Sequence, residues 1–218
     1  MALPYKAVIF DMDGVLIDSE PFWRQAQIET LANYGAEITV EACIQYTMGK
    51  RLDAIAAIWC HRCQLEVDPT ILAEEILHKL IVQVREHGRS LPGVHQLLNA
   101  LKQAGYRIGL ATSSGPEIIQ AVLQRLEIKD YFSQICSAEN EDYGKPHPAV
   151  YLSAARQLDV VPDACLVIED SVTGMIAAKA ASMTTFVVNE HNSDPRFTLA
   201  DQCFTSLEEI VPLINSMD

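Results

Sequence analysis

The chain has few cationic side chains for its size. Lysine and arginine total 16 against 29 aspartates and glutamates, which gives a formal net charge of -13 at pH 7. This surplus of negative charge repels nucleic acids and anionic membrane surfaces, so we expect neither as a partner. A phosphorylated ligand would also be repelled unless cations gather where it binds.

Long apolar runs are absent as well. The first apolar segment becomes polar again at Asp11, and the other apolar stretches are all interrupted. The sequence therefore predicts neither a signal peptide nor a membrane-spanning helix, and we expect a cytoplasmic protein.

Cysteine is too sparse for a secreted disulfide scaffold, because the six cysteines are scattered through apolar surroundings. We expect them to be reduced core residues. Cys60 and Cys63 have the spacing of half a zinc site, but no second pair with matching spacing completes it. On a helix the two would simply share the inner face.

The 218 residues, 49% of them hydrophobic, are enough for one domain with a modest insert and a real core. Short β-branched segments alternate with longer helical ones, a pattern typical of a parallel sheet with helices on both faces. The expected strands are Ala7–Phe10, Arg107–Thr112, Gln134–Ser137, Ala164–Ile168, Thr184–Val188 and Gln202–Thr205.

A long segment without strands separates the first two strands. It predicts helices at Pro21–Tyr34, Arg51–Leu65 and Pro69–His87. Because this segment is too long for a crossover, we expect an α/β fold in which a Rossmann-like parallel sheet core, residues 1–18 and 90–218, carries an inserted small all-helical cap domain, residues 19–89. The cap would form a lid over the first strand's carboxyl end.

Acidic side chains follow two of the buried strands. Asp11 and Asp13 come directly after the first strand, and Glu169 and Asp170 follow the strand that ends at Ile168. Taken alone, Asp13 fits an ordinary Asp-Gly turn, and the later pair fits a helix start stabilised by its dipole. Unpaired acids at the end of a core strand are nevertheless costly unless a cation or a reaction compensates.

Two further segments add hydroxyl groups and a cation. Thr112, Ser113 and Ser114 precede a helix and offer donors to an anion, although a plain N-cap is an equal reading. Lys145, followed by a proline, would bring a point charge, although such a pair is usually surface loop. Because ligands bind beyond the carboxyl ends of parallel strands, all these groups should converge at one edge. Converging carboxylates require a hard divalent cation, and Mg²⁺ is the natural candidate.

In order along the chain, these motifs resemble those of the haloacid dehalogenase superfamily, in its helical-cap branch of sugar phosphatases and β-phosphoglucomutases. The resemblance covers essentially the whole chain and looks closest to bacterial hexose and hexitol phosphatases of the 2-deoxyglucose-6-phosphate phosphatase kind. It rests on Asp11 to Glu20, Ala111 to Ser114, Lys145-Pro146 and Ile168 to Ser171.

The resemblance implies a Mg-dependent phosphatase of small sugar phosphates. Asp11 would attack phosphorus and form an aspartyl-phosphate, while Asp13 would protonate the leaving sugar oxygen and then activate water. Hexose 6-phosphates such as 2-deoxyglucose 6-phosphate are the expected substrates, with hexitol phosphates as further candidates. The implied phosphate- or substrate-binding residues are Asp11, Met12, Asp13, Thr112, Ser113 and Lys145, and the implied metal-site residues are Asp11, Asp13, Glu169 and Asp170.

The cap should select the sugar. Gly49 and Lys50 lie in a glycine turn before a helix, and in the resembling enzymes the corresponding loop faces the active site; a solvated helix start is the alternative. Glu20 and Trp23, just past the first hinge, are further candidates. Trp23 suits stacking on a sugar but equally suits the core of the cap.

Other functions share parts of this pattern. A β-phosphoglucomutase would return the phosphoryl group to the sugar, but that family has Asp-Thr-Ala and a nearby histidine where this chain has Asp18-Ser19-Glu20 and Trp23. A dehalogenase lacks the second acid, and a phospho-accepting receiver-type signalling domain lacks the helical insert. A catalytically silent member that binds a partner is a further alternative. No apolar surface stripe stands out, so we expect a monomer.

Overall fold

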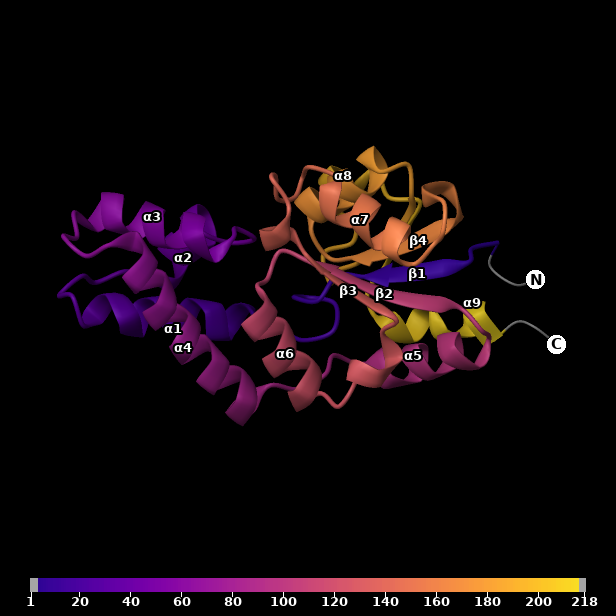
Figure 1. Ribbon diagram of the computed structural model, residues 1–218, viewed down its shortest axis with the longest axis horizontal. Coiled ribbons are helices and arrows are strands. Elements are labelled where there is room, and N and C mark those ends of the chain that lie inside the picture. Colours follow the sequence, from indigo (N-terminus) through magenta and orange to yellow (C-terminus); the bar gives the residue numbers. More distant parts are fainter. Residues whose placement is uncertain (1–3, 216–218) are drawn as a thin grey trace.

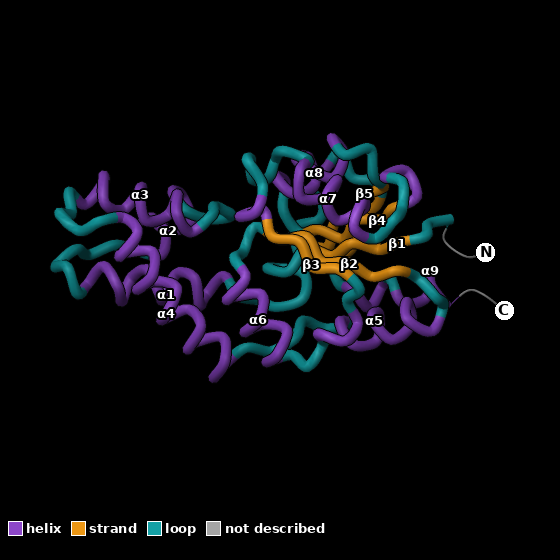
Figure 2. The backbone as a smooth tube through the Cα atoms, in the orientation of Figure 1, coloured by secondary structure: helices purple, strands orange, loops and turns teal. Residues whose placement is uncertain are grey.

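One parallel sheet forms the centre of the molecule. The computed structural model describes residues 4–215, and Figure 2 shows the sheet in orange. Its six strands lie in the order β3-β2-β1-β4-β5-β6. All neighbouring strands pair in parallel, which confirms the predicted sheet. The strands are β1 (Ala7–Phe10), β2 (Arg107–Thr112), β3 (Gln134–Ser137), β4 (Cys165–Glu169), β5 (Thr184–Val188) and β6 (Gln202–Phe204).

Helices cover both faces of this sheet (Figure 1). On one side lie α5 (Val94–Gln103), α6 (Pro116–Arg125) and α9 (Val211–Asn215), and on the other lie α7 (Ala149–Gln157) and α8 (Val172–Ala180). Alternate residues of β1 face opposite sides: Val8 and Phe10 belong to the cluster with α5, whereas Ile9 packs with α7. A strand buried on both faces is apolar throughout, which is why β1 stood out in the sequence.

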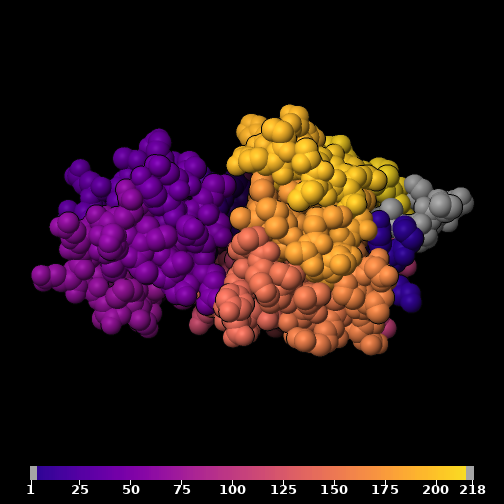
Figure 3. Space-filling view, turned by 90° about the horizontal axis from the view of Figure 1, so that it is seen from above, coloured from indigo at the N-terminus to yellow at the C-terminus, as the bar shows by residue number. Residues whose placement is uncertain are grey.

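The segment between β1 and α5 is helical, as predicted, and lies beyond the carboxyl end of the sheet (Figure 1). It forms a second lobe of the molecule (Figure 3). No strand occurs between residues 19 and 89, all of which the structure describes. Its helices are α1 (Glu20–Ala32), α2 (Val40–Tyr46), α3 (Leu52–Cys63) and α4 (Pro69–His87). The α2 helix was not expected, because it is short and only Cys43 is fully buried, so it carries no inner apolar stripe.

A buried polar network fixes the cap helices against one another. The Gln27 side-chain oxygen accepts hydrogen bonds from Thr47 Oγ1 at 2.8 Å and from Trp59 Nε1 at 2.7 Å. Its nitrogen donates to the Trp23 carbonyl at 3.0 Å. Because buried polar groups must be paired, this network locks α1 to α3 and holds the loop before Gly49 in place.

The cysteines are free thiols. Cys43, Cys136 and Cys165 are buried, while Cys60 and Cys63 lie on α3 and pack against the core as expected. Within residues 4–215, no helix combines the length and the apolar character needed to cross a membrane.

Candidate active site

A cavity of about 690 Å³ lies between the cap and the carboxyl ends of the strands. All the residues expected to take part in catalysis or in binding of phosphate, metal or sugar line this cavity except Met12 and Glu169, which are fully buried. From the sheet side come Asp11, Asp13, Thr112, Ser113, Ser114, Lys145 and Asp170, and from the cap side Glu20, Trp23, Ile44, Met48, Gly49, Lys50 and Leu52.

Asp11 and Lys145 form the central ion pair. The Asp11 backbone N–H continues the sheet by donating to the Ile168 carbonyl at 2.9 Å. Lys145 Nζ donates to Asp11 Oδ1 at 2.8 Å, to the Ala111 carbonyl at 3.1 Å and to Glu169 Oε1 at 2.7 Å. All three ammonium protons are therefore used, and the lysine charge is fixed between two carboxylates.

The carboxylates at this edge outnumber the cation. Burial raises the pKa of Asp11 to about 7, with Lys145 opposing the shift and Glu169 adding to it. The pKa of Asp170 also lies well above its ordinary value because of burial and of the charges on Glu169 and Asp11. Burial works against the charge of Lys145, but Asp11 and Glu169 outweigh it and raise its pKa. One lysine is therefore not enough to favour the ionised form of all these carboxyl groups.

Asp13 has a different environment. Its carboxylate accepts hydrogen bonds from Ser19 Oγ, from Trp23 Nε1 at 3.4 Å and from Ser114 Oγ at 2.7 Å. Two of these donors belong to the start of the cap, and the third belongs to the loop after β2. Asp13 is therefore held at the junction of cap and core, apart from the ion pair of Asp11.

The turn directly after Asp13 requires Gly14. Its φ is +77°, in the left-handed region, and a Cβ there would lie 2.1 Å from Asp170 Oδ2. The glycine thus lets the loop after β1 pass directly against the loop after β4.

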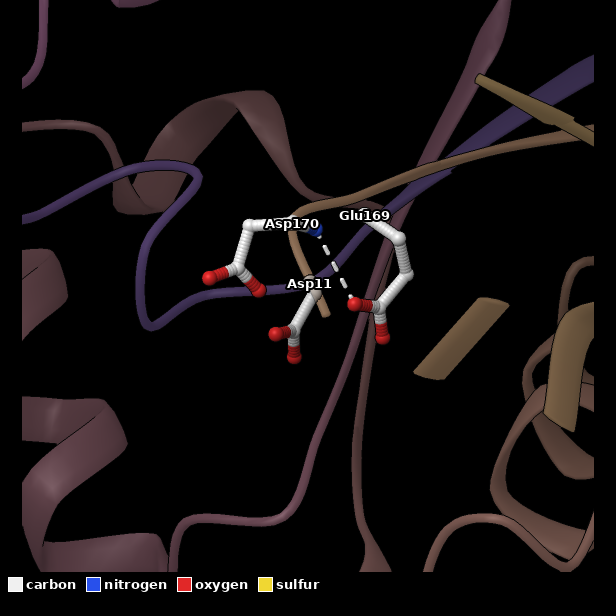
Figure 4. A group of neighbouring side chains, drawn as sticks. All are labelled: Asp11, Glu169 and Asp170. Carbon is white, nitrogen blue, oxygen red and sulfur yellow. Dashed lines mark hydrogen bonds between the residues drawn. The ribbon is translucent and has the colours of Figure 1, made fainter. Parts of the chain in front are cut away.

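Three carboxylates lie close enough to share a metal ion. Asp11, Glu169 and Asp170 each offer an oxygen within 4.8 Å of the others (Figure 4). The Asp13 side chain does not belong to this group. The oxygens of Glu169 already accept five hydrogen bonds, from Lys145, Tyr151, the Asp170 N–H and the Ser171 N–H and Oγ. Asp11 and Asp170 therefore have the freer oxygens.

The loop after β2 presents hydroxyl and backbone donors. Thr112 Oγ1 accepts from the Ser114 N–H at 3.1 Å, and Ser137 Oγ donates to the Ser114 carbonyl at 2.7 Å. These bonds shape the loop that leads into the N-terminus of α6, where backbone N–H groups favour an anion.

Three site residues, Ser19, Arg51 and Tyr151, had no assigned role in the sequence, and Ser114, expected as an anion donor or an N-cap, has a different one. Ser19 and Ser114 hold Asp13, and Tyr151 OH donates to Glu169 at 2.6 Å. Arg51 of the cap reaches the core, where its Nη1 lies 3.4 Å from the Ala138 carbonyl and 3.5 Å from that of Glu141. Their residue types gave no local signal, because each partner comes from another part of the fold.

Gly174 should be essential for stability. A Cβ at this position would lie 1.6 Å from Glu169 Oε1, so Gly174→Ala must displace a fully buried carboxylate from its hydrogen bonds. We expect the free energy of unfolding, measured by urea denaturation, to fall by about 3 kcal/mol. Gly144→Ala is the control, since its Cβ would meet only the flexible Arg51 side chain at 3.3 Å. Equal stabilities of the two variants would contradict this account of the Glu169 pocket.

Comparison with known proteins agrees with this geometry. The family model of the haloacid dehalogenase-like hydrolases matches residues 5–182. Hexitol phosphatase B of Escherichia coli is 41% identical over 94% of this chain and 93% of its own length. Fructose-1-phosphate phosphatase of the same organism is 33% identical over 82% of this chain and 94% of its own.

A solved structure extends the likeness to both lobes. The β-phosphoglucomutase of Clostridium difficile superposes with a TM-score of 0.82 at 27% identity, covering 97% of each chain. The family match spans the loops that carry Asp11, Thr112, Lys145 and Asp170, and these are the loops that meet at the cavity. The chain is therefore an enzyme that belongs to the haloacid dehalogenase-like hydrolases.

Proposed function

We propose that this protein is a Mg-dependent phosphatase of small sugar phosphates that works through an aspartyl-phosphate. The observation that carries the proposal is that Asp11 and Asp13, two residues apart in the loop after β1, have different hydrogen-bond partners. Asp11 is paired with Lys145, whereas Asp13 is held by Ser19, Trp23 and Ser114. Carboxylates in different environments are suited to different tasks.

In the first step, an Asp11 carboxylate oxygen would form a bond to phosphorus while the bond from phosphorus to the sugar oxygen breaks. Asp13, protonated at that stage, would give its proton to the departing oxygen. In the second step, Asp13 would take a proton from water as the water oxygen attacks phosphorus. Phosphate leaves, and the carboxylate of Asp11 is restored.

The donor set fits Mg²⁺. Asp11 and Asp170 supply hard carboxylate oxygens less than 4.8 Å apart, and the Asp13 backbone carbonyl is a further candidate ligand. The oxygens of Glu169 already accept hydrogen bonds from neighbouring residues, so Glu169 would position Lys145 and the loop after β4. When bound, the ion would offset the excess negative charge and stabilise charge on the phosphoryl oxygens, to which Thr112, Ser113 and Lys145 are the candidate donors.

We propose further that residues 19–89 act as a cap domain that selects the substrate. Glu20, Trp23, Gly49 and Lys50 all lie on the cavity wall. The cavity volume of about 690 Å³ suits a phosphorylated six-carbon chain. The names of the Escherichia coli relatives support a hexitol phosphate or a hexose phosphate as substrate. Among hexose phosphates, we propose 2-deoxyglucose 6-phosphate from the resemblance of the sequence motifs.

A sugar-phosphate mutase is the second candidate, supported by the likeness to β-phosphoglucomutase. It would use the same two aspartates but return the phosphoryl group to the sugar. We favour hydrolysis because Trp23 stands where the mutase pattern has a histidine, and its indole N–H donates to Asp13.

A panel of substrates tests both candidates. We expect phosphate release from hexitol 6-phosphates and 2-deoxyglucose 6-phosphate with Mg²⁺ and its loss in the presence of a chelator. A parallel assay follows conversion of β-glucose 1-phosphate to glucose 6-phosphate, which we expect to be absent. Conversion of β-glucose 1-phosphate to glucose 6-phosphate without phosphate release would show that the protein is a mutase and not a phosphatase.

A further inference from the structure

The hydroxyl group of Tyr151 has no part in the chemistry described so far. Tyr151 lies on α7 and is fully buried, yet its OH donates to Glu169 Oε1 at 2.6 Å. The ammonium group of Lys145 lies 4.8 Å from the centre of the same ring. One tyrosine therefore contacts both members of the Lys145 and Glu169 ion pair.

Glu169 has one fixed place in this structure. Its Oε2 accepts from the Asp170 N–H, the Ser171 N–H and Ser171 Oγ, each at 3.0–3.1 Å. Its Oε1 accepts from two groups only, Lys145 Nζ and Tyr151 OH. If the tyrosine hydroxyl were removed, Oε1 would be left with the lysine alone, and the two ions would draw closer together.

Such a movement would change the contact between Lys145 and Asp11. The ammonium group bridges Asp11 Oδ1 and Glu169 Oε1 at nearly equal distances, 2.8 and 2.7 Å. A shift of Lys145 toward Glu169 lengthens its bond to Asp11. The ring of Tyr151 adds a second restraint, because its face attracts the ammonium group of Lys145 that lies over it.

We propose that Tyr151 is a positioning residue that sets the place of Lys145 against Asp11. It does so through its hydroxyl on Glu169 and through its ring beside Lys145, without touching the substrate. The proposal rests on the function proposed above for Asp11, but the position of Lys145 can be measured independently of turnover.

Tyr151→Phe keeps the ring and removes the hydroxyl. We expect kcat to fall by about tenfold with KM changed by less than about twofold, since the change acts on the reacting groups and not on the cap. Tyr34→Phe is the matched control, because Tyr34 OH donates to Glu75 at 3.0 Å within the cap. This control also removes a tyrosine hydroxyl that donates to a glutamate, and it should keep kcat.

The ammonium signal of Lys145 in ¹H–¹⁵N spectra gives the second readout, assigned by its absence from Lys145→Arg. We expect it to shift in Tyr151→Phe and to stay in place in Tyr34→Phe. An unshifted signal together with a kcat like that of the control would overturn the proposal. If the wild-type protein hydrolyses no phosphate ester, the proposed function fails, and the ammonium signal alone decides the role of Tyr151.

Discussion

Asp11→Asn is expected to reduce phosphate release by at least about 10³-fold, because an amide oxygen is a far weaker nucleophile than a carboxylate. The fold should remain, since asparagine has nearly the same shape and Lys145 keeps its bonds to Glu169 and the Ala111 carbonyl. Phosphate release with Mg²⁺ is the measurement. Retained turnover would remove Asp11 from the nucleophile role.

The same variant should be more stable than the wild type in metal-free buffer. Burial raises the pKa of Asp11 to about 7 from 3.8, so above pH 7 the folded protein must hold a charge that it disfavours. Below pH 7 the folded protein binds the proton, and the penalty shrinks until it vanishes near pH 4, where the unfolded chain is protonated too. The gain in melting temperature should therefore be largest above pH 7. Asp18→Asn, an exposed change on the same segment, should show no such pattern.

Asp13→Asn is expected to slow both chemical steps, with kcat lowered by about 10²- to 10⁴-fold on a sugar phosphate. Asparagine can neither protonate the leaving oxygen nor accept a proton from water. The two losses can be separated with p-nitrophenyl phosphate, whose leaving group needs no proton. With that substrate the first step should proceed, and the phosphorylated protein should accumulate.

Acid quenching and measurement of labelled phosphate on the protein would detect this intermediate. The wild-type protein and Asp18→Asn should accumulate much less phosphoprotein, because both keep Asp13, which activates the water that hydrolyses the aspartyl-phosphate. If Asp13→Asn turns over normally, or if it is blocked without accumulating phosphoprotein, then Asp13 does not serve both steps.

The strands could be predicted closely because each is a short apolar run between turns. Five of the six begin at the expected residue. β4 starts at Cys165, one residue later than expected, because Ala164 closes a 3₁₀ turn, and it includes Glu169 as its last residue. The short α2 helix could not be predicted, since its exposed Val40 and Ile44 do not follow the inward stripe of a buried helix.

Site residues could be predicted from the sequence where a chemically reactive or charged side chain stands at a position that the fold places at the strand ends. Asp11 and Asp170 are charged residues beside buried strands, where such residues are rare. Lys145 was predictable only together with them, because a lysine before a proline is usually part of a surface loop. Ser114 and Tyr151 are common residue types at their positions. A serine before a helix suggests an N-cap, and an aromatic residue on a helix suggests core packing. Their roles depend on partners 101 and 18 residues away, and only the folded chain specifies such contacts.

The position of β1 at the middle of the sheet also bears on synthesis of the protein. Ala7 pairs with Arg107 on one side and with Cys165 on the other, so neither neighbour exists when β1 leaves the ribosome. At roughly 5–20 residues per second, this fully apolar strand waits on the order of 5 to 20 seconds for its first partner. The helical segment of residues 19–89 emerges during that interval, and its folding would shorten the span that β1 must search to find β2.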